Sequence, residues 1–136
     1  MKLTTLLKLQ IVYVILGLAY NCLNVYFMTT GKTPLVSAQP LPGIIAMVVY
    51  GLFLIPGYLR KLVLYRILMG IAIVVMGYGG VVANIINIFT RPELYSSIVA
   101  WAAAVGINIF GLVLNIIAVS GKFKRIVQAD IPEPVT

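Results

Sequence analysis

Four long runs of apolar residues, separated by short polar segments, dominate the pattern of the chain. They cover roughly residues 9–27, 41–59, 62–89 and 94–119, and none has a charged side chain near its middle. A helix of about 20 apolar residues crosses the hydrocarbon core of a bilayer, so each run is long enough for one span. A bilayer leaves no water to satisfy open strand edges, which favours helices. The pattern therefore predicts an all-α integral membrane bundle of four transmembrane helices.

The lengths of the runs and of the segments between them predict how the helices connect. The third run is longer than a bilayer requires, so we expect this helix to tilt or to begin with a turn near Tyr65 and Arg66. The short turn at residues 90–93 makes the third and fourth helices antiparallel neighbours. We expect one four-helix transmembrane domain over residues 1–121, followed by a basic and then proline-containing cytoplasmic tail over residues 122–136.

Basic residues are distributed unequally between the two sides of the predicted bundle. Eight of the ten fall on one side, and only Lys32 and Arg91 fall on the other. Cytoplasmic segments carry an excess of Lys and Arg, so both termini are predicted to be cytoplasmic. The asymmetry and the short loops favour the inner membrane of a bacterial cell, although an organelle membrane fits the same pattern. The residues expected to set the topology and to contact lipid headgroups are Arg60, Lys61, Arg66, Lys122, Lys124 and Arg125.

Composition agrees with a membrane protein and narrows its partners. Apolar residues make up 62% of the chain and charged residues 10%, against about 45–50% and 25% in soluble domains. The formal net charge is +7, but the basic residues flank apolar runs. Such residues contact anionic lipid, so a bilayer is the expected partner and nucleic acid is not. Cys22 is the single cysteine, which excludes an intramolecular disulfide.

Two stretches of the chain have nearly the same spelling: GLAYNCLNVYF begins at Gly17 and GVVANIINIF begins at Gly80. In each, Asn follows the glycine at +4 and +7, and an aromatic residue follows at +9. The same offset of 63 residues places Gly43 on Gly106. These matches suggest two tandem helical hairpins related as a parallel repeat, with the axis along the membrane normal. Chance similarity between apolar segments is the alternative explanation.

Every asparagine in the chain lies within a predicted span, although asparagine usually favours turns. An amide buried without a partner costs about 1–3 kcal/mol, so each side chain needs one. Two explanations remain open. The amides form hydrogen bonds between packed helices, or they line a crevice that opens to the outer side with Asn108 at its floor. The six residues are Asn21, Asn24, Asn84, Asn87, Asn108 and Asn115.

Small residues share faces with these amides, as in closely packed membrane helices. In the third run the glycines and asparagines follow a heptad-like spacing, and the fourth run shows a similar stripe. The first, third and fourth helices are therefore expected to pack on one another or on a partner subunit. The glycines expected at helix contacts are Gly17, Gly70, Gly77, Gly80 and Gly111.

Catalytic chemistry finds little support in the sequence. The chain has no histidine, and its only acids are Glu93, Asp130 and Glu133, all outside the spans. No pair of carboxylates can face a common substrate, and no cluster has metal-ligand spacing. We therefore expect neither an enzyme nor a cofactor or metal. Proton-coupled transport is disfavoured because the cores of the spans contain no ionisable group.

These observations favour a small non-catalytic multi-pass membrane protein that acts as a subunit, scaffold or assembly factor of a membrane complex. The alternative is an oligomeric carrier or channel for a small polar or lipid-like solute, with the asparagines as its lining. Four helices rarely enclose a pore, so that alternative requires a homo-oligomer. The asparagines are also compatible with a small-molecule ligand.

Overall fold

A computed structural model describes residues 1–124 of the chain. Residues 125–136 of the predicted tail, Arg125 among them, lie outside the described residues. Within the described part the chain is helical and contains no strand, and four helical segments are long and apolar enough to cross a membrane. These segments are Leu3–Thr29, Leu41–Tyr58, Leu62–Thr90 and Ile98–Ser120. The predictions of an all-helical fold and of four candidate spans are therefore confirmed.

The second and third segments are each divided into shorter elements. The elements are α1 (Leu3–Thr29), α2 (Leu41–Phe53), α3 (Ile55–Tyr58), α4 (Leu62–Met76), the π-helix η1 (Gly77–Val82), α5 (Ala83–Thr90), the 3-10 helix η2 (Pro92–Leu94) and α6 (Ile98–Ser120). The division between α2 and α3 has a local cause. Pro56 lacks the N–H that would continue the hydrogen-bond ladder, so the helix tightens into a turn at Leu54.

The ends of two helices differ from those predicted. α1 begins six residues before the apolar run because Leu3, Leu6 and Leu7 are buried against the bundle. α6 begins later than expected, at Ile98. Residues 92–94 form the 3-10 turn, and the Ser97 hydroxyl accepts a hydrogen bond of 3.1 Å from the backbone N–H of Ala100. This side-chain cap fixes the start of the last helix.

The third segment is helical from Leu62 and has no break at Tyr65 or Arg66. Its irregularity lies deeper, where η1 widens the helix at Gly77–Val82. A π-turn inserts one residue into the α-helical ladder and frequently lies at a functional site. No residue pattern in the sequence predicts this element.

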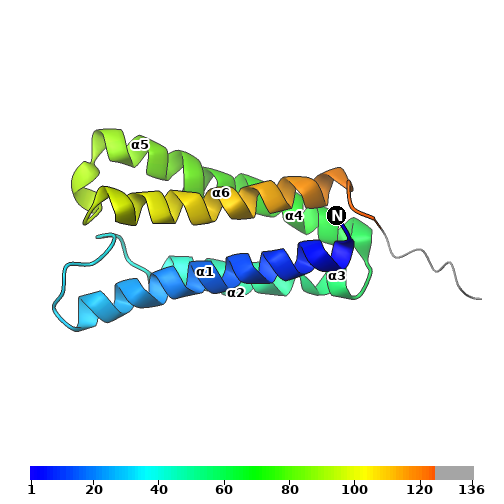
Figure 1. The fold of residues 1–136 in the computed structure, drawn as a ribbon, viewed down its shortest axis with the longest axis horizontal. Helices are drawn as coiled ribbons and strands as arrows, with labels where there is room; N and C mark the ends of the chain where they lie inside the picture. Colours follow the sequence, from blue (N-terminus) through cyan, green and yellow to red (C-terminus); the bar gives the residue numbers. More distant parts are fainter. Residues whose placement is uncertain (125–136) are drawn as a thin grey trace, which may run out of the picture.

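The four segments form two antiparallel hairpins that lie side by side, one made of α1 with α2 and α3, the other of α4, η1 and α5 with α6 (Figure 1). The main packing surfaces join α4 to α6, α1 to α2 and α1 to α6. At one end the N-terminus meets the last described residues, because the N–H of Lys124 donates to the carbonyl of Met1 at 2.7 Å. We call this the basic end, since Lys2, Arg60, Lys61, Arg66, Lys122 and Lys124 lie there. The opposite end carries the connections 30–40 and 91–97 and is called the loop end.

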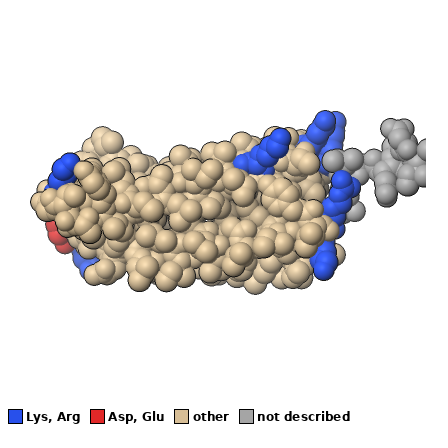
Figure 2. Space-filling view, turned by 90° about the horizontal axis from the view of Figure 1, so that it is seen from below, with Lys and Arg blue, Asp and Glu red and all other residues tan. Residues whose placement is uncertain are grey.

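The surface between the two ends carries large apolar side chains. Figure 2 shows Lys and Arg at the ends of the molecule and a middle without charges, apart from one basic side chain nearer the basic end. Val63, Val74 and Phe89 are each more than two-thirds exposed. Exposed apolar patches of this extent mark contact with lipid or with another protein. This exposed apolar surface agrees with the four helices that are apolar enough to cross a membrane.

Candidate functional site

A closed cluster of polar side chains lies in the half of the bundle nearer the basic end. We call it the Gln10 cluster, and it consists of Gln10, Tyr50, Tyr65 and Asn115, each at most 1% exposed. The amide nitrogen of Gln10 donates to Asn115 Oδ1 at 3.2 Å, and the Tyr50 hydroxyl donates to the same oxygen. The Tyr65 hydroxyl donates to Gln10 Oε1. These bonds tie α1, α2, α4 and α6 together.

The bonds of the Gln10 cluster run between its own members. Within residues 1–124, no buried side-chain nitrogen or oxygen lacks a hydrogen-bond partner. Its members therefore act as packing residues that specify how the four helices meet. Of the four members, only Asn115 was among the residues predicted to pack helices or line a site, and the Tyr65 ring is wholly buried. The signal that could have identified this cluster is the length of the Gln10 and tyrosine side chains, which can cross from one helix to the next.

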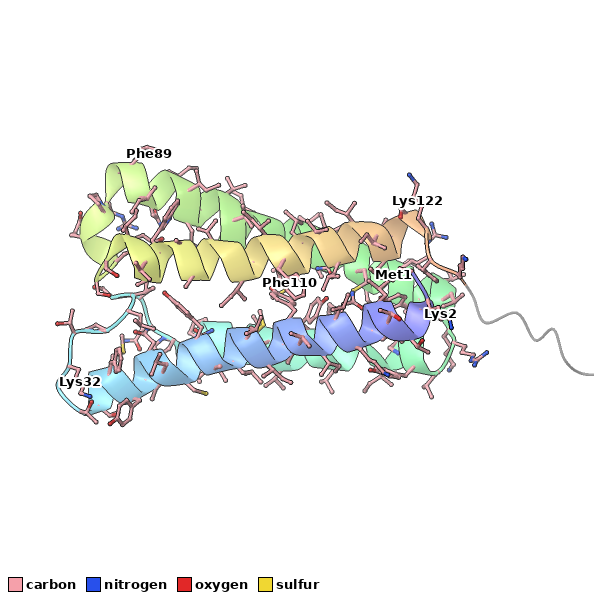
Figure 3. The ribbon with its side chains drawn as sticks, in the orientation of Figure 1. Met1, Lys2, Lys32, Phe89, Phe110 and Lys122 are labelled. Atoms are coloured by element: carbon pink, nitrogen blue, oxygen red, sulfur yellow. The ribbon has the colours of Figure 1, made fainter. Side chains whose placement is uncertain are left out.

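Tyr13 separates this cluster from the other half of the bundle. Its ring meets that of Tyr50 edge-on, with centroids 5.1 Å apart, and its hydroxyl donates to Asn108 Oδ1 at 3.2 Å. Gly111 of α6 makes this arrangement possible, because a Cβ there would overlap the Tyr13 ring. Phe110 extends from α6 toward α1 at the same level (Figure 3). The middle of the bundle is therefore filled.

A cavity of about 390 Å³ lies on the other side of Tyr13, toward the loop end. All four helical segments line it, together with residues 36–40 of the longest connection. We call it the asparagine cavity because Asn21, Asn24, Asn84 and Asn108 contribute to its wall. Asn87 does not line the cavity, and Asn115 belongs to the Gln10 cluster. The structure thus brings four of the six predicted asparagines to one space.

Three of these amides have the same local geometry. The nitrogens of Asn21, Asn84 and Asn108 each donate at 2.8 Å to the carbonyl four residues earlier in the same helix. An amide nitrogen carries two hydrogens. For Asn21 and Asn108 this i−4 bond uses one of the two hydrogens, whereas the Asn84 nitrogen also donates to the carbonyl of Gly79 at 3.4 Å. The cavity wall consequently offers hydrogen-bond donors and acceptors with no formal charge.

Asn24 has a different role, because it holds the connection that covers the cavity. Its nitrogen donates to the carbonyl of Val36 at 3.0 Å, and its oxygen accepts from the N–H of Val36 at 3.3 Å. Val36 also pairs with Tyr95 in an isolated antiparallel bridge, in which the N–H of Ser37 donates to the carbonyl of Leu94 at 2.8 Å. The first loop-end connection therefore forms a roof over the cavity and is held in place by the second.

Tyr95 extends this roof to the third segment. Its hydroxyl donates to Asn84 Oδ1, and the indole N–H of Trp101 donates to the backbone carbonyl of Asn84 at 2.9 Å. Burial raises the pKa of Tyr95 above its ordinary value. The phenol therefore stays protonated and remains a donor at neutral pH. Asn84 is thus held from two sides at the wall of the cavity.

Glycines allow the close approach of helices around the cavity. A Cβ at Gly17 would overlap the Met47 side chain, and one at Gly80 would overlap the Asn108 amide. Gly77 is less crowded, with Leu112 at 3.4 Å from the position of a Cβ. Gly70 differs from these residues, because no atom lies within 4 Å of its Cβ position. Gly70 therefore makes no close helix contact within the described part of the chain.

The basic end has its own fixed contacts. The Arg66 guanidinium donates from Nε and from a terminal nitrogen to the carbonyl of Val119, at 2.9 and 2.6 Å, and so caps the last turn of α6. Arg60, Lys61, Lys122 and Lys124 are exposed. Figure 3 shows Lys2 and Lys122 at this end and Lys32 at the loop end. Arg125, predicted as a further headgroup contact, lies outside the described residues.

The described residues provide no metal cluster, since His, Cys, Asp and Glu nowhere gather in threes between residues 1 and 124. Comparison of the chain with protein-family models, curated proteins and solved structures finds no match. Fold and site together define a helical bundle with four candidate membrane spans, a closed polar cluster toward one end and an asparagine-lined cavity toward the other.

Proposed function

We propose that this protein is a non-catalytic multi-pass membrane protein that binds a small uncharged molecule in the asparagine cavity. The observation that carries the proposal is the convergence of Asn21, Asn84 and Asn108 on one cavity of about 390 Å³. Ligand sites commonly measure about 300–1,000 Å³ and combine an apolar wall with a few placed polar groups. The asparagine cavity meets both criteria without help from a second chain.

The hydrogen bonds argue against a purely packing role for these amides. Polar residues that join helices donate across the interface, as Gln10 does toward Asn115. Asn21 instead donates to its own helix, as do Asn84 and Asn108. The oxygens of Asn84 and Asn108 accept from Tyr95 and Tyr13, so Asn21 has the most hydrogen-bonding capacity left for a bound molecule.

The filled middle of the bundle supports a binding site rather than a channel through one chain. Tyr13 and the Gln10 cluster occupy the space between the cavity and the basic end. A solute that entered from the loop end would therefore stop at Asn108. The excess of basic residues at the opposite end supports cytoplasmic termini, a cavity on the outer side and a place in the inner membrane.

A role as a subunit of a membrane complex or homo-oligomer is the second candidate function. The observation that favours it is the open space beside Gly51, Gly70 and Gly106, where no atom lies within 4 Å of a Cβ position. Small residues on lipid-facing helix surfaces allow another helix to approach closely. Both candidates are compatible, since a ligand-binding subunit uses its cavity and its outer surface for different contacts.

The test is to ask whether the purified protein retains a neutral molecule and whether filling the cavity removes it. Ala46 lines the cavity, whereas Ala103 is exposed on α6 and does not line it. Protein is purified in a mild detergent, and the retained molecules are extracted and quantified by mass spectrometry. We expect a neutral molecule at close to one per chain in the wild type, at least a fivefold loss in Ala46→Leu, and no change in Ala103→Leu.

A second measurement tests for a ligand that binds weakly and is lost during purification. Native mass spectrometry of the stripped protein is repeated with neutral probes from glycerol to n-octanol. Saturable binding that is lost in Ala46→Leu supports the proposal. The absence of both a retained molecule and saturable probe binding, or equal binding in the two variants, overturns it.

A further inference from the structure

The cavity has an open side between two helices, and this inference rests on the proposed function of the cavity as a binding site. α2 approaches α1, α3 and α4 closely, but none of its Cα atoms lies within 8 Å of one in η1 or α5. Pro42, Gly43 and Ala46 of α2 nevertheless line the same cavity as Gly79 of η1. The two helices therefore face each other across the cavity without packing.

The remaining sides of the cavity are closed. α1 packs on α6, and the Tyr20 hydroxyl donates to the carbonyl of Ala100 at 2.8 Å, which seals that interface near the loop end. The roof is fixed by the bond between Asn24 and Val36 and by the bridge from Val36 to Tyr95. The floor is formed by Asn108, with Tyr13 bonded to it from below.

The residues at the open side lie on the outer surface of the bundle. Val75 is 61% exposed although it also lines the cavity, and Gly79 and Pro42 are exposed as well. Large apolar side chains surround them on the same surface, including Val74 and Tyr78. In a membrane this surface faces acyl chains. The opening therefore connects the cavity with the bilayer and not only with water.

The wall chemistry selects the kind of molecule that fits. Apolar side chains such as Met47, Met76 and Ile107 form much of the wall, and no lining residue is charged. The amides of Asn21 and Asn108 offer hydrogen bonds in the interior. A charged headgroup would lose its hydration without a counter-charge, which is costly in an apolar site. An uncharged headgroup with both donors and acceptors would not suffer this loss.

We infer that the ligand is a neutral amphipathic, lipid-like molecule that enters sideways from the bilayer between α2 and η1. Its hydroxyl-bearing or carbonyl-bearing head occupies the cavity and bonds to the amides of Asn21 and Asn108. Its apolar tail passes between Val75 and Ala46 and remains among the surrounding acyl chains. The π-turn of η1 contributes Gly79 to this passage, where no atom lies within 4 Å of its Cβ position.

The experiment uses full-length protein in phosphatidylcholine vesicles and two photoreactive probes. One probe is a diazirine-bearing monoacylglycerol in the bilayer, and the other is a diazirine-bearing butanediol in the water. Val75→Trp narrows the passage, and Val74→Trp is the matched control, because Val74 is equally apolar, 71% exposed and absent from the cavity wall. Labelled positions are mapped by peptide mass spectrometry.

We expect saturable labelling by the monoacylglycerol within residues 42–47 and 75–80. This labelling should fall at least fivefold in Val75→Trp and remain unchanged in Val74→Trp. If only the butanediol labels the cavity, entry is from water: the inference fails while the proposed function stands. Labelling that does not saturate, or that is equal in both variants, overturns the inference as general lipid contact. If neither probe labels the cavity, binding there fails and both ideas are overturned.

Discussion

The two polar regions of this bundle use similar side chains and reach opposite outcomes. In the Gln10 cluster, polar groups from four helices satisfy one another and are sealed from solvent. In the asparagine cavity, the nitrogens of three amides bond along their own helices, two of their oxygens accept from tyrosines, and a space remains between them. The difference shows that a polar residue in an apolar span does not by itself indicate packing or binding. The length of its side chain and the residues around it decide which of the two roles it has.

Side-chain length explains much of this difference. Gln10 and the tyrosines extend far enough to cross from one helix to the next, so they close the Gln10 cluster. Asparagine is shorter, and in a helix its nitrogen bonds readily to the carbonyl four residues earlier. Helix separation accounts for the rest. α1 and α6 approach closely at Gly111, whereas no Cα atom of α2 lies within 8 Å of one in η1.

The largest effect is expected where Tyr13 divides the two regions. In Gly111→Ala the new Cβ would overlap the buried Tyr13 ring, so α1 and α6 must separate. Such overpacking costs about 1–3 kcal/mol, and we expect the upper end because Tyr13 is held by Tyr50 and Asn108. Denaturant unfolding of the detergent-solubilised protein measures the cost.

Gly106→Ala is the matched control on the same helix, since no atom lies within 4 Å of its Cβ position. It should leave the free energy of unfolding unchanged or raise it by up to about 1 kcal/mol through helix propensity. Equal destabilisation in both variants would show that the Tyr13 contact is not what limits the approach of α1 and α6.

Breaking the Gln10 cluster should have the next largest effect. In Gln10→Leu the Tyr65 hydroxyl loses its acceptor in a fully buried place, and Asn115 loses one donor. A buried polar group left unpaired costs about 1–3 kcal/mol, so a loss of about 2 kcal/mol is expected in the same unfolding measurement. Ile11→Leu, at an exposed neighbouring position, should change stability by less than about 0.5 kcal/mol. A Gln10→Leu variant as stable as the wild type would show that the cluster is not needed for packing.

The sequence predicts the helices of this protein better than it predicts its two polar regions. Apolar run length alone indicates four spans, since a segment that crosses a bilayer must satisfy its backbone polar groups internally, as a helix does. The Gln10 cluster could not be predicted, because its bonds depend on how four helices rotate and on which side chains reach across. The asparagine cavity could be predicted in part. One of the two explanations for the asparagines placed them around a crevice with Asn108 at its floor, whereas no residue pattern indicated the π-turn or the separation of α2 from η1.

A smaller effect is expected for the roof of the cavity. In Asn24→Ala the N–H and carbonyl of Val36 both lose their side-chain partner, while the bridge to Tyr95 remains. The free energy of unfolding should fall by only about 1 kcal/mol. Hydrogen exchange at the Val36 amide should accelerate by about fivefold, since 1.4 kcal/mol corresponds to a factor of ten. The Ser120→Ala variant, which changes a hydroxyl at the opposite end, should leave that exchange rate unchanged. Unchanged exchange in Asn24→Ala would show that the bridge alone holds the roof.

The smallest effect on stability, and the sharpest test of the comparison, is expected at the cavity wall. In Asn21→Ala the only bond lost is the one from the amide to the carbonyl of Gly17 in the same helix, and the side chain is partly exposed. The free energy of unfolding should change by less than about 0.5 kcal/mol. Asn115→Ala, which removes an amide of the same type from the Gln10 cluster, should cost about 2 kcal/mol because the Tyr50 and Gln10 groups lose their acceptor. The ratio of the two costs measures how far each amide serves packing. Similar costs at the two positions would contradict the division into a packing cluster and a binding cavity. A large difference, with loss of the retained molecule only in Asn21→Ala, is what that division requires.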